Sequence, residues 1–596
     1  MAFRRAHHRN APPFEREIQV NTHPLILAFG PVLTHFSLFR AFTDPEIIDA
    51  LLLQYIGVAW QVQFKRNFKR IFSSKAWTRA PKVPFTENQQ PIREQLGIKS
   101  GKSGIEYSRE QLRERHFFLS GLTTTARELK SYDDLLDAPS SSGDYGPAET
   151  KKKLLHFMTT ECRLNTTLKG THAIIRSDIE WFGPSLPHSS ILALLKFFGI
   201  SSQWLAFFEA FLRAPLRFKQ DPPGETRIRK RGTPIAYALS MLCGEVVLFG
   251  MDFAVNQKAS WLFLHRMHDD LWLWDADAEK CAAGWEEMNI YAELVGLKFN
   301  KSKTGSAWVG PGQPAGLPAG DIRWGLLSFD PKQARFIVNQ EDVDGHIVEL
   351  RRQLAATKSI FGWVNAYNKY MAFFVRNFGG RPALCFDNVH VTDMIDTLAK
   401  IQRELFPSTE GGPVGYLRTV IEKRFDIRDL PSGYFYLPIA RGGMELRNPM
   451  IEMLSAETET WKTTAEEKIK DQMKRDEETY NALKAAWLEK RGRGRGQFMS
   501  FEEYTALRES WLRDWMACYD RMLLDAKISH PQLTGVVKAL TPEYKWDSMD
   551  WYEKWVISLH GEEVAKRFGG LNIVDATLIP VGMVQLFKTS RMKLDE

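Results

Sequence analysis

The stretch Leu262–Trp274, LFLHRMHDDLWLW, places two adjacent aspartates, Asp269 and Asp270, between two runs of apolar residues. The residues on both sides suit strands, and a link of two to four residues centred on HDD predicts an antiparallel hairpin with both carboxylates at its tip. Two charges about 4 Å apart repel by roughly 4 kcal/mol at an effective dielectric constant of 20. The pair therefore needs a compensating charge, and a divalent cation is the usual one.

An acidic surface turn is the commoner explanation of such a pair, and the chain contains a comparison. The second pair, in SYDDLLD (131–137), lacks flanking strand patterns and is interpreted as an exposed helix end. The pair at 269–270 differs because Asp178 ends another predicted strand, at 170–182, and the turn 296–305 offers Lys303. Three carboxylates from two strands could hold two cations roughly 3.5–4 Å apart, which is the geometry for in-line phosphoryl transfer.

The bulk composition is that of an ordinary protein with several domains. The 596 residues exceed one hydrophobic core, and a net charge of +7 permits a polyanionic partner without demanding one. The five cysteines form no C-x-x-C pair, so neither a zinc module nor a disulfide framework is indicated, and an intracellular setting is expected. The apolar run 50–64 is too short to span a bilayer, which favours a core helix.

Hydrophobic periodicity predicts the elements around these carboxylates. We expect helices at 148–164, 235–255 and 279–295, two helices within 188–215 that are separated at Gly199, a strand pair near 322–330, and one long charged helix over 452–490. A basic loop (222–234) precedes the second of these helices and carries Arg227, Arg229, Lys230 and Arg231.

This order of segments resembles the palm of reverse transcriptases. SDIEWF, RGTPIAYALS, MHDD, GLKFNKSKT and WGLLSFD resemble five of its motifs, in the right order, over about residues 170–330. FGISSQWLAFFEAFLRAP (198–215) is similar to a helical connection of group II intron-type enzymes. Long unclassified flanks and the lack of retroelement accessories resemble the rvt group of domesticated fungal reverse transcriptases.

The resemblance implies an α+β fold, a right-hand polymerase with fingers, a ferredoxin-like palm and a thumb, plus helical extensions at both ends. The implied domains are a helical N-terminal region (1–80), a fingers-like region with a mobile loop (81–170), the palm (171–330), a helical thumb-like region (331–450) and a helical C-terminal extension (451–596).

The implied activity is addition of nucleotides to a 3′-hydroxyl by two-metal phosphoryl transfer. Asp178, Asp269 and Asp270 are the implied ligands of Mg²⁺ or Mn²⁺, and Lys303 would protonate the leaving pyrophosphate. Gly183, Arg229, Arg231 and Gly232 would face nucleotide or template. The implied partners are an RNA or DNA template and primer and nucleoside triphosphates, with no membrane, in the cytoplasm or nucleus.

Gly183 stands five residues after Asp178, where reverse transcriptases usually carry a bulky aromatic residue that excludes the ribose 2′-hydroxyl. Glycine predicts acceptance of both ribonucleotides and deoxyribonucleotides. The alternative is that Trp181 or Phe182 occupies the same space and Gly183 only eases a turn.

Some residues depart from the family pattern. Ile235 and Ala236 replace a Gln-Gly pair, and Met267 replaces the tyrosine of Y-x-D-D. These departures favour an alternative, a catalytically degenerate polymerase relative that binds nucleic acid or acts as a scaffold. A helical interaction protein with accidental motifs is a third reading. The triphosphate-binding cation of the fingers has four candidates: Arg93, Arg113, Arg127 and Arg163.

Overall fold

The computed structural model describes only part of the chain. The described residues are 16–20, 41–44, 46–82, 93, 103–124, 147–218, 222, 226–234, 238–407, 409–456, 463–489, 498–533, 535–540, 546, 549–575 and 578. The acidic pair in 131–137, the mobile loop expected within 81–170, Arg127, Ile235 and Ala236 lie outside these ranges.

A four-stranded antiparallel sheet forms the centre of the molecule. It contains β3 (His172–Asp178), β6 (His265–Met267), β7 (Asp270–Asp275) and β8 (Gly305–Val309). The strand order is β6-β7-β3-β8, and each neighbouring pair is antiparallel. The predicted hairpin is confirmed, with β6 and β7 joined through two residues, and so is the predicted strand that ends at Asp178.

Helices cover both faces of this sheet, which explains the unbroken apolar run of β7. Trp274 lies 5.3 Å from the ring of Phe157, in α4 (Pro147–Lys169). The preceding residue, Leu273, points to the opposite face of the sheet, toward Gly284 of α9 (Ala278–Val295). Leu271 to Trp274 are at most 4% exposed.

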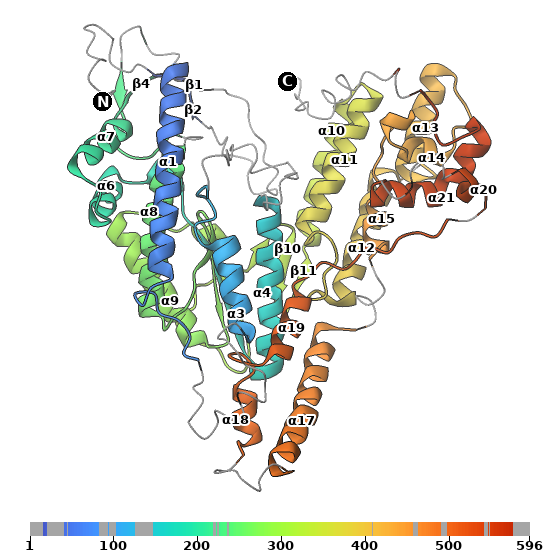
Figure 1. Cartoon of the computed structure of the whole chain (residues 1–596). Helices are drawn as coiled ribbons and strands as arrows, with labels where there is room; N and C mark the ends of the chain where they lie inside the picture. Colours follow the sequence, from blue (N-terminus) through green and yellow to red (C-terminus); the bar gives the residue numbers. More distant parts are fainter. Residues whose placement is uncertain are drawn as a thin grey trace.

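An arm built on α8 (Ala238–Lys258) flanks the sheet (Figure 1). It contains α1 (Ile47–Phe72), α6 (His188–Phe197) and α7 (Ser202–Leu212). The predicted separation of α6 and α7 at Gly199 is confirmed. Phe68 of α1 stacks on Phe249 of α8 at 3.9 Å.

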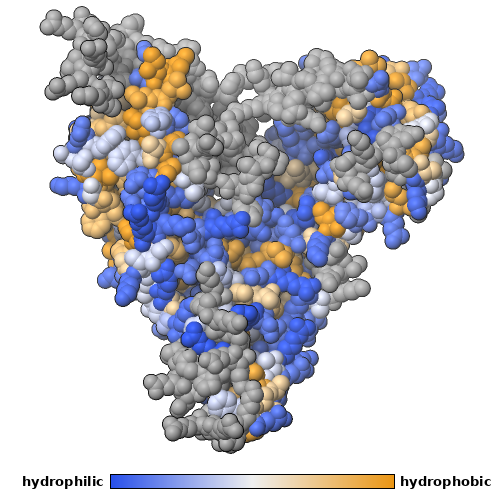
Figure 2. Space-filling view, viewed as in Figure 1, coloured by the Kyte–Doolittle hydropathy of each residue, from blue (hydrophilic) through white to orange (hydrophobic). Residues whose placement is uncertain are grey.

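Two helices of this arm are long and apolar enough to cross a membrane, by length and composition only: α1, with 28% of its apolar window buried, and α8, with 72%. A core helix was expected around the apolar run 50–64. The observed helix, α1, extends beyond that run at both ends. Apolar residues gather at the upper end of α1 in Figure 2 and are exposed there: Ile47, Ile48, Leu51 and Tyr55.

The expectation of an entirely helical N-terminal region is wrong for two stretches. β1 (Arg16–Val20) and β2 (Ala41–Asp44) form strands that join β4 (Pro215–Phe218) and β5 (Arg227–Ile228) in a second sheet of order β2-β1-β4-β5. Strand pairing with residues about 200 positions away is a tertiary effect that local periodicity does not carry.

The segment after β8 begins with a third sheet and continues as a helical arm on the other side of the molecule (Figure 1). The sheet contains β9 (Arg323–Trp324), β10 (Leu327–Asp330) and β11 (Arg335–Val338). The helices are α10 (Gln340–Ala356), α11 (Ile360–Asn377), α12 (Asp387–Leu405), α13 (Gly412–Phe425), α14 (Ser432–Tyr436) and α15 (Pro449–Leu454). The single helix expected over 452–490 is wrong, because α15 ends at Leu454 and α17 (Ala465–Glu489) begins separately.

The C-terminal region is helical in its described part and packs on α3, α4 and the helical arm that follows the third sheet. Its helices are α17, α18 (Phe501–Ala506), α19 (Arg513–Met522), α20 (Gly535–Leu540) and α21 (Trp551–Phe568). α17 packs on α4, α19 packs on α3 (Ile105–Leu112), and α21 packs on α14.

A buried ionic cluster fixes α19 to α3 and α4. Arg109 of α3 donates to both oxygens of Glu161 at 2.8 and 2.9 Å, and to Glu509 at 2.5 Å. The Tyr519 hydroxyl of α19 donates to Glu161. Because Arg109 is only 5% exposed, these acidic partners offset the cost of burying its positive charge.

Candidate active site

Asp178 and Asp270 lie directly opposite each other on neighbouring strands. They are register partners at the end of the β3–β7 ladder, so their side chains project from the same face of the sheet. The Asp178 side chain is 16% exposed and that of Asp270 is 25% exposed. Like charges in directly opposed positions destabilise a sheet, so this placement requires compensation.

Asp269 lies in the hairpin turn beside this pair. His268 and Asp269 form the two-residue connection between Met267 and Asp270, and His268 has φ 57°, in the left-handed region. Within the described part of the chain, the Asp269 carboxylate has no ion pair. The structure therefore brings together the three carboxylates named from the sequence.

Lys303 reaches the same place from a different segment. The 3₁₀ turn Lys301–Lys303 is capped by Asn300, whose backbone N–H donates to the Asp178 carbonyl at 2.7 Å. Lys303 Nζ lies 3.1 Å from Asp178 Oδ2, and its side chain is 52% exposed. The contact places an ammonium group, open to solvent, beside Asp178, which is more buried than Asp270.

A second cation, Arg176, belongs to the site and was not anticipated. It stands two residues before Asp178 on β3, hence on the same face. Its Nε lies 3.3 Å from Asp270 Oδ1, its Nη1 donates to the carbonyl of Arg323 at the start of β9, and its guanidinium lies 5.2 Å from the Trp272 ring centroid. Three contacts hold this arginine, whereas Lys303 has one ion pair.

Proton affinity at the site follows from this crowding. Burial raises the pKa of the Asp178 carboxyl, the Lys303 ammonium opposes that shift, and the negative charges of Asp269 and Asp270 add to it. Among the described residues, the three carboxylates of the site face two cations, Lys303 and Arg176, and the remaining negative charge favours binding of a further cation.

The donor chemistry suits Mg²⁺ or Mn²⁺, which prefer carboxylate oxygens. The side chains as arranged do not form a complete shell. Among the described residues no group of three or more histidine, cysteine, aspartate or glutamate side chains is placed to hold a metal ion. Asp178 faces Lys303 and Asp270 faces Arg176, so the carboxylates are in place but partly neutralised by the protein itself.

Behind the hairpin tip lies a buried ionic group, which we call the Arg266 cluster: Arg266, Glu245, Asp252 and His268. Arg266 Nη1 donates to Glu245 at 2.8 Å, and its Nε and Nη2 donate to Asp252 at 2.8 to 2.9 Å. His268 Nδ1 lies 2.9 Å from the other Glu245 oxygen. The cluster ties the strand β6 and the turn to α8.

The two carboxyls of the Arg266 cluster differ in their proton affinity. Burial alone would raise the pKa of Glu245, but Arg266 and His268 lower it to about 2. Burial raises the pKa of Asp252 to about 6 although Arg266 opposes the shift. Glu245 therefore holds its negative charge to lower pH than Asp252 does.

Gly244 makes room for this arrangement. A Cβ atom there would lie 2.7 Å from His268 Cε1 and 3.0 Å from the Phe182 ring. The Phe182 and His268 rings meet edge to face at 5.0 Å. A side chain at position 244 would push the histidine, and with it the turn that carries Asp269, away from α8.

Gly183 lies in the short helix α5 (Phe182–Ser185), and a Cβ built on it meets nothing within 4 Å. Phe182 is 3% exposed and packs on His268, while Trp181 is 56% exposed with φ 51°. The space beside Gly183 is open among the described residues, as the sugar prediction requires; sugar choice itself stays a prediction.

The structure gives Arg229, Arg231 and Gly232 partners within the protein. Arg231 donates to the carbonyls of Ser185 and Gly296 at 3.0 and 2.8 Å, and Arg229 donates to the Phe211 carbonyl at 2.7 Å. Gly232 has φ 79°, and a Cβ there would lie 2.5 Å from the Pro184 carbonyl. These contacts dock the basic loop on α5, α7 and the C-terminal end of α9. Contact with nucleotide or template stays a prediction.

The three described candidates for the triphosphate-binding cation occupy different environments. Arg163 is buried and paired with Asp387 at 2.7 Å and Glu466 at 3.1 Å, so it serves as a structural link. Arg113 lies over the Phe263 ring, and Arg93 lies over the Trp511 ring.

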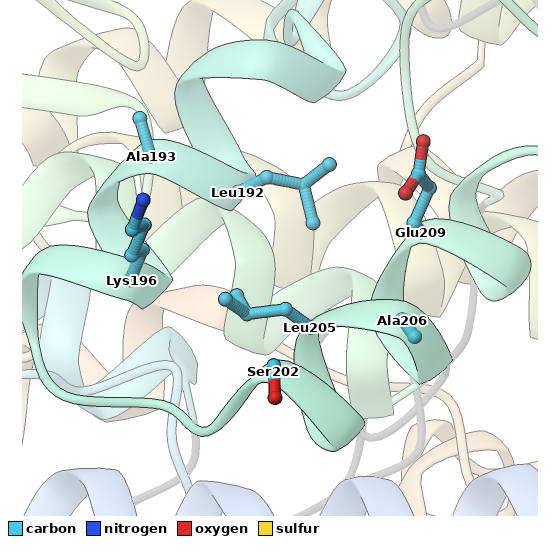
Figure 3. Close-up of a pocket in the computed structure, with 7 residues that line it drawn as sticks. All are labelled: Leu192, Ala193, Lys196, Ser202, Leu205, Ala206 and Glu209. Atoms are coloured by element: carbon cyan, nitrogen blue, oxygen red, sulfur yellow. The ribbon is translucent and has the colours of Figure 1, made fainter.

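A shallow groove between α6 and α7, about 370 Å³, lies apart from these residues (Figure 3). Leu192, Leu205 and Ala206 line it, with Lys196 and Glu209 at its sides. None of the site carboxylates takes part in it.

Sequence reasoning missed Arg176 and Arg266. For Arg176 a signal was present, because a cation two residues before Asp178 on a strand must share its face. Arg266 has a weaker signal, an arginine inside an otherwise apolar strand, which requires a buried partner that one sequence does not identify.

No family model and no curated protein matches the chain. Solved structures show partial similarity. These include apo telomerase from Candida tropicalis, truncated from its C-terminal domain (15% identity, 51% of this chain and 53% of that chain, TM-score 0.28). They also include telomerase from Candida albicans in complex with a TWJ fragment of telomeric RNA (13% identity, 70% of this chain and 65% of that chain, TM-score 0.31). A third is the RNA-dependent RNA polymerase of a human picobirnavirus (12% identity, 46% of this chain and 52% of that chain, TM-score 0.26).

The chain thus spans between 52% and 65% of the length of these structures. With such partial similarity, the function proposed below depends on the residues of the site.

Proposed function

We propose that the chain is a template-directed nucleotidyl transferase of the reverse transcriptase type, which adds nucleotides to a 3′-hydroxyl. The observation that carries the proposal is the pairing of Asp178 with Asp270 across β3 and β7, with Asp269 in the adjoining turn and Lys303 on Asp178. The sheet order β8-β3-β7-β6 supports a ferredoxin-like palm, with residues 81–170 as fingers and 331–450 as thumb.

In this proposal each residue has a defined task. Asp178 and Asp269 hold Mg²⁺ or Mn²⁺, which when bound would activate the attacking hydroxyl and neutralise the leaving pyrophosphate. Lys303 leaves Asp178 to give a proton to that pyrophosphate. Open space at Gly183 accepts either sugar. Membership of the fungal rvt group and a location in cytoplasm or nucleus belong to the same proposal.

A second function is favoured by one observation. Arg176 pairs with Asp270 inside the site, and a fixed cation among the carboxylates suits a polymerase relative that binds nucleic acid without catalysis. Met267 in place of tyrosine points the same way.

Primer extension separates the two functions. The full chain is incubated with labelled ribonucleotides or deoxyribonucleotides on RNA and DNA templates, with Mg²⁺ or Mn²⁺. Asp269→Asn should reduce incorporation about a hundredfold or more, the usual scale for removing one electrostatic contact to a transition state. Asp275→Asn is the matched control, because Asp275 lies at the far end of β7 and pairs with Lys280. A wild-type protein that binds primer–template and adds no nucleotide is the degenerate relative.

A further inference from the structure

The two cations inside the candidate site are held very differently. Lys303 has a 52% exposed side chain and one contact, at 3.1 Å to Asp178. Arg176 is 21% exposed and touches Asp270, the Arg323 carbonyl and the Trp272 ring. A lysine on a flexible stem leaves its partner easily, whereas a guanidinium held at three points does not.

The contacts of Arg176 other than Asp270 come from two strands, β7 and β9. Trp272 is fully buried in the centre of β7, and the Arg323 carbonyl belongs to β9. If Asp270 turned away, the Arg176 guanidinium would lose its only carboxylate partner among the described residues. Its other two contacts would still hold it beside Asp270.

We infer that Arg176 withdraws Asp270 from metal binding, so that the site takes a divalent cation through Asp178 and Asp269, with Lys303 as the group that is displaced. The inference rests on the proposed function only for the location of the metal. It assigns to Arg176 the role of a positioning residue that sets how strongly the site binds Mg²⁺ or Mn²⁺.

The physical consequence is weak cation binding. A unit positive charge fixed near a divalent ion opposes its binding, and two available carboxylates attract it less than three. Removal of the arginine charge should free Asp270 and tighten binding by at least about tenfold, equivalent to about 1.4 kcal/mol.

Binding of Mn²⁺ alone tests this without any catalysis. Electron paramagnetic resonance measures free Mn²⁺ during titration of the full chain. Starting from the wild type, Asp269→Asn should abolish binding at the site. Asp270→Asn should weaken it by only about tenfold, because this change removes no ligand and leaves the Arg176 charge unpaired. Arg176→Met should bind Mn²⁺ at least about tenfold more tightly, and the double variant Arg176→Met, Asp270→Asn should lose that gain.

Arg176→Lys provides the second variant. It keeps the positive charge but not the fixed guanidinium contacts, so its affinity for Mn²⁺ should lie between those of the wild type and Arg176→Met. Thermal unfolding of each variant checks that it folds. Binding that weakens equally in Asp269→Asn and Asp270→Asn would overturn the inference, as would an unchanged affinity in Arg176→Met or a lack of binding in both wild type and Arg176→Met.

The outcome is separable from that of the proposed function. If the protein binds Mn²⁺ in this pattern but adds no nucleotide in primer extension, the proposed polymerase function is refuted and the role of Arg176 stands. A protein that extends primers while Asp270→Asn abolishes Mn²⁺ binding keeps the polymerase assignment and loses the role of Arg176.

Discussion

Replacement of Arg266 by methionine should loosen the hairpin that carries Asp269 and Asp270. The substitution keeps most of the side-chain volume and removes the charge. Arg266 is 1% exposed, and its three nitrogens donate to Glu245 and Asp252. Without it, two carboxyls remain buried in α8 with no arginine opposite them.

Two lines of reasoning give the magnitude. Removal of one partner from a buried ion pair typically costs 3–5 kcal/mol. The pKa of Glu245 falls from 4.5 to about 2 in the folded protein, and a shift of this size corresponds to about 3 kcal/mol at neutral pH. Because this pKa is depressed, the stabilisation is present above pH 4.5 and is lost as the pH falls toward 2.

Hydrogen exchange of the β7 amides at pH 7 measures the effect, because it reports the local opening free energy in a protein of several domains. Arg266→Met should accelerate exchange by roughly two to three and a half orders of magnitude. Arg428→Met is the control: its partners Glu422 and Asp426 are exposed, so its ion pairs should contribute little.

The triple variant Arg266→Met, Glu245→Gln, Asp252→Asn tests the cause. With the buried charges removed together, exchange should return to within about tenfold of the wild type. Equal exchange in the single and triple variants would refute the electrostatic explanation, and wild-type exchange in Arg266→Met would refute any stabilising role for the Arg266 cluster.

Three further outcomes are expected. Lys303→Leu should slow single-nucleotide addition about a hundredfold, the scale of general acid catalysis, with unchanged template binding; an unchanged rate would make Lys303 an ordinary surface residue. Gly183→Tyr should lower ribonucleotide incorporation relative to deoxyribonucleotide incorporation, whereas a wild type that already rejects ribonucleotides would show that another residue guards the sugar. Burial lowers the pKa of His172 to about 3. Because this pKa is depressed, acid destabilises the fold, by roughly 2 kcal/mol between pH 6.5 and 4.5. In urea unfolding, His172→Gln should make the free energy of unfolding depend less on pH over this range.

The parts of the fold that periodicity predicts are those formed by local sequence. The hairpin, the strand ending at Asp178 and the break between α6 and α7 were all predictable, because short apolar runs and a glycine with φ 84° act within a few residues. The strand β1 was not, since its partner β4 lies about 200 residues away.

The same distinction applies to the candidate site. Its carboxylates and Lys303 could be named from the order of motifs. The partner of each cation could not be predicted in this way, because whether Arg176 faces Asp270 or solvent depends on β9 and on the Trp272 ring. Glu245 and Asp252 likewise read as ordinary helix residues until α8 is packed against β6.

The cluster around Arg109 has a consequence for how the chain is made. Glu509 and Arg109 are 400 residues apart, and a ribosome that adds about 5–20 residues per second needs roughly 20–80 s to produce the second after the first. Throughout that interval α3 and α4 lack Tyr519 and Glu509, so Arg109 and Glu161 each lack a partner that they have in the folded protein. The buried charge of Arg109 therefore acquires its full set of partners only when the last quarter of the chain has been made.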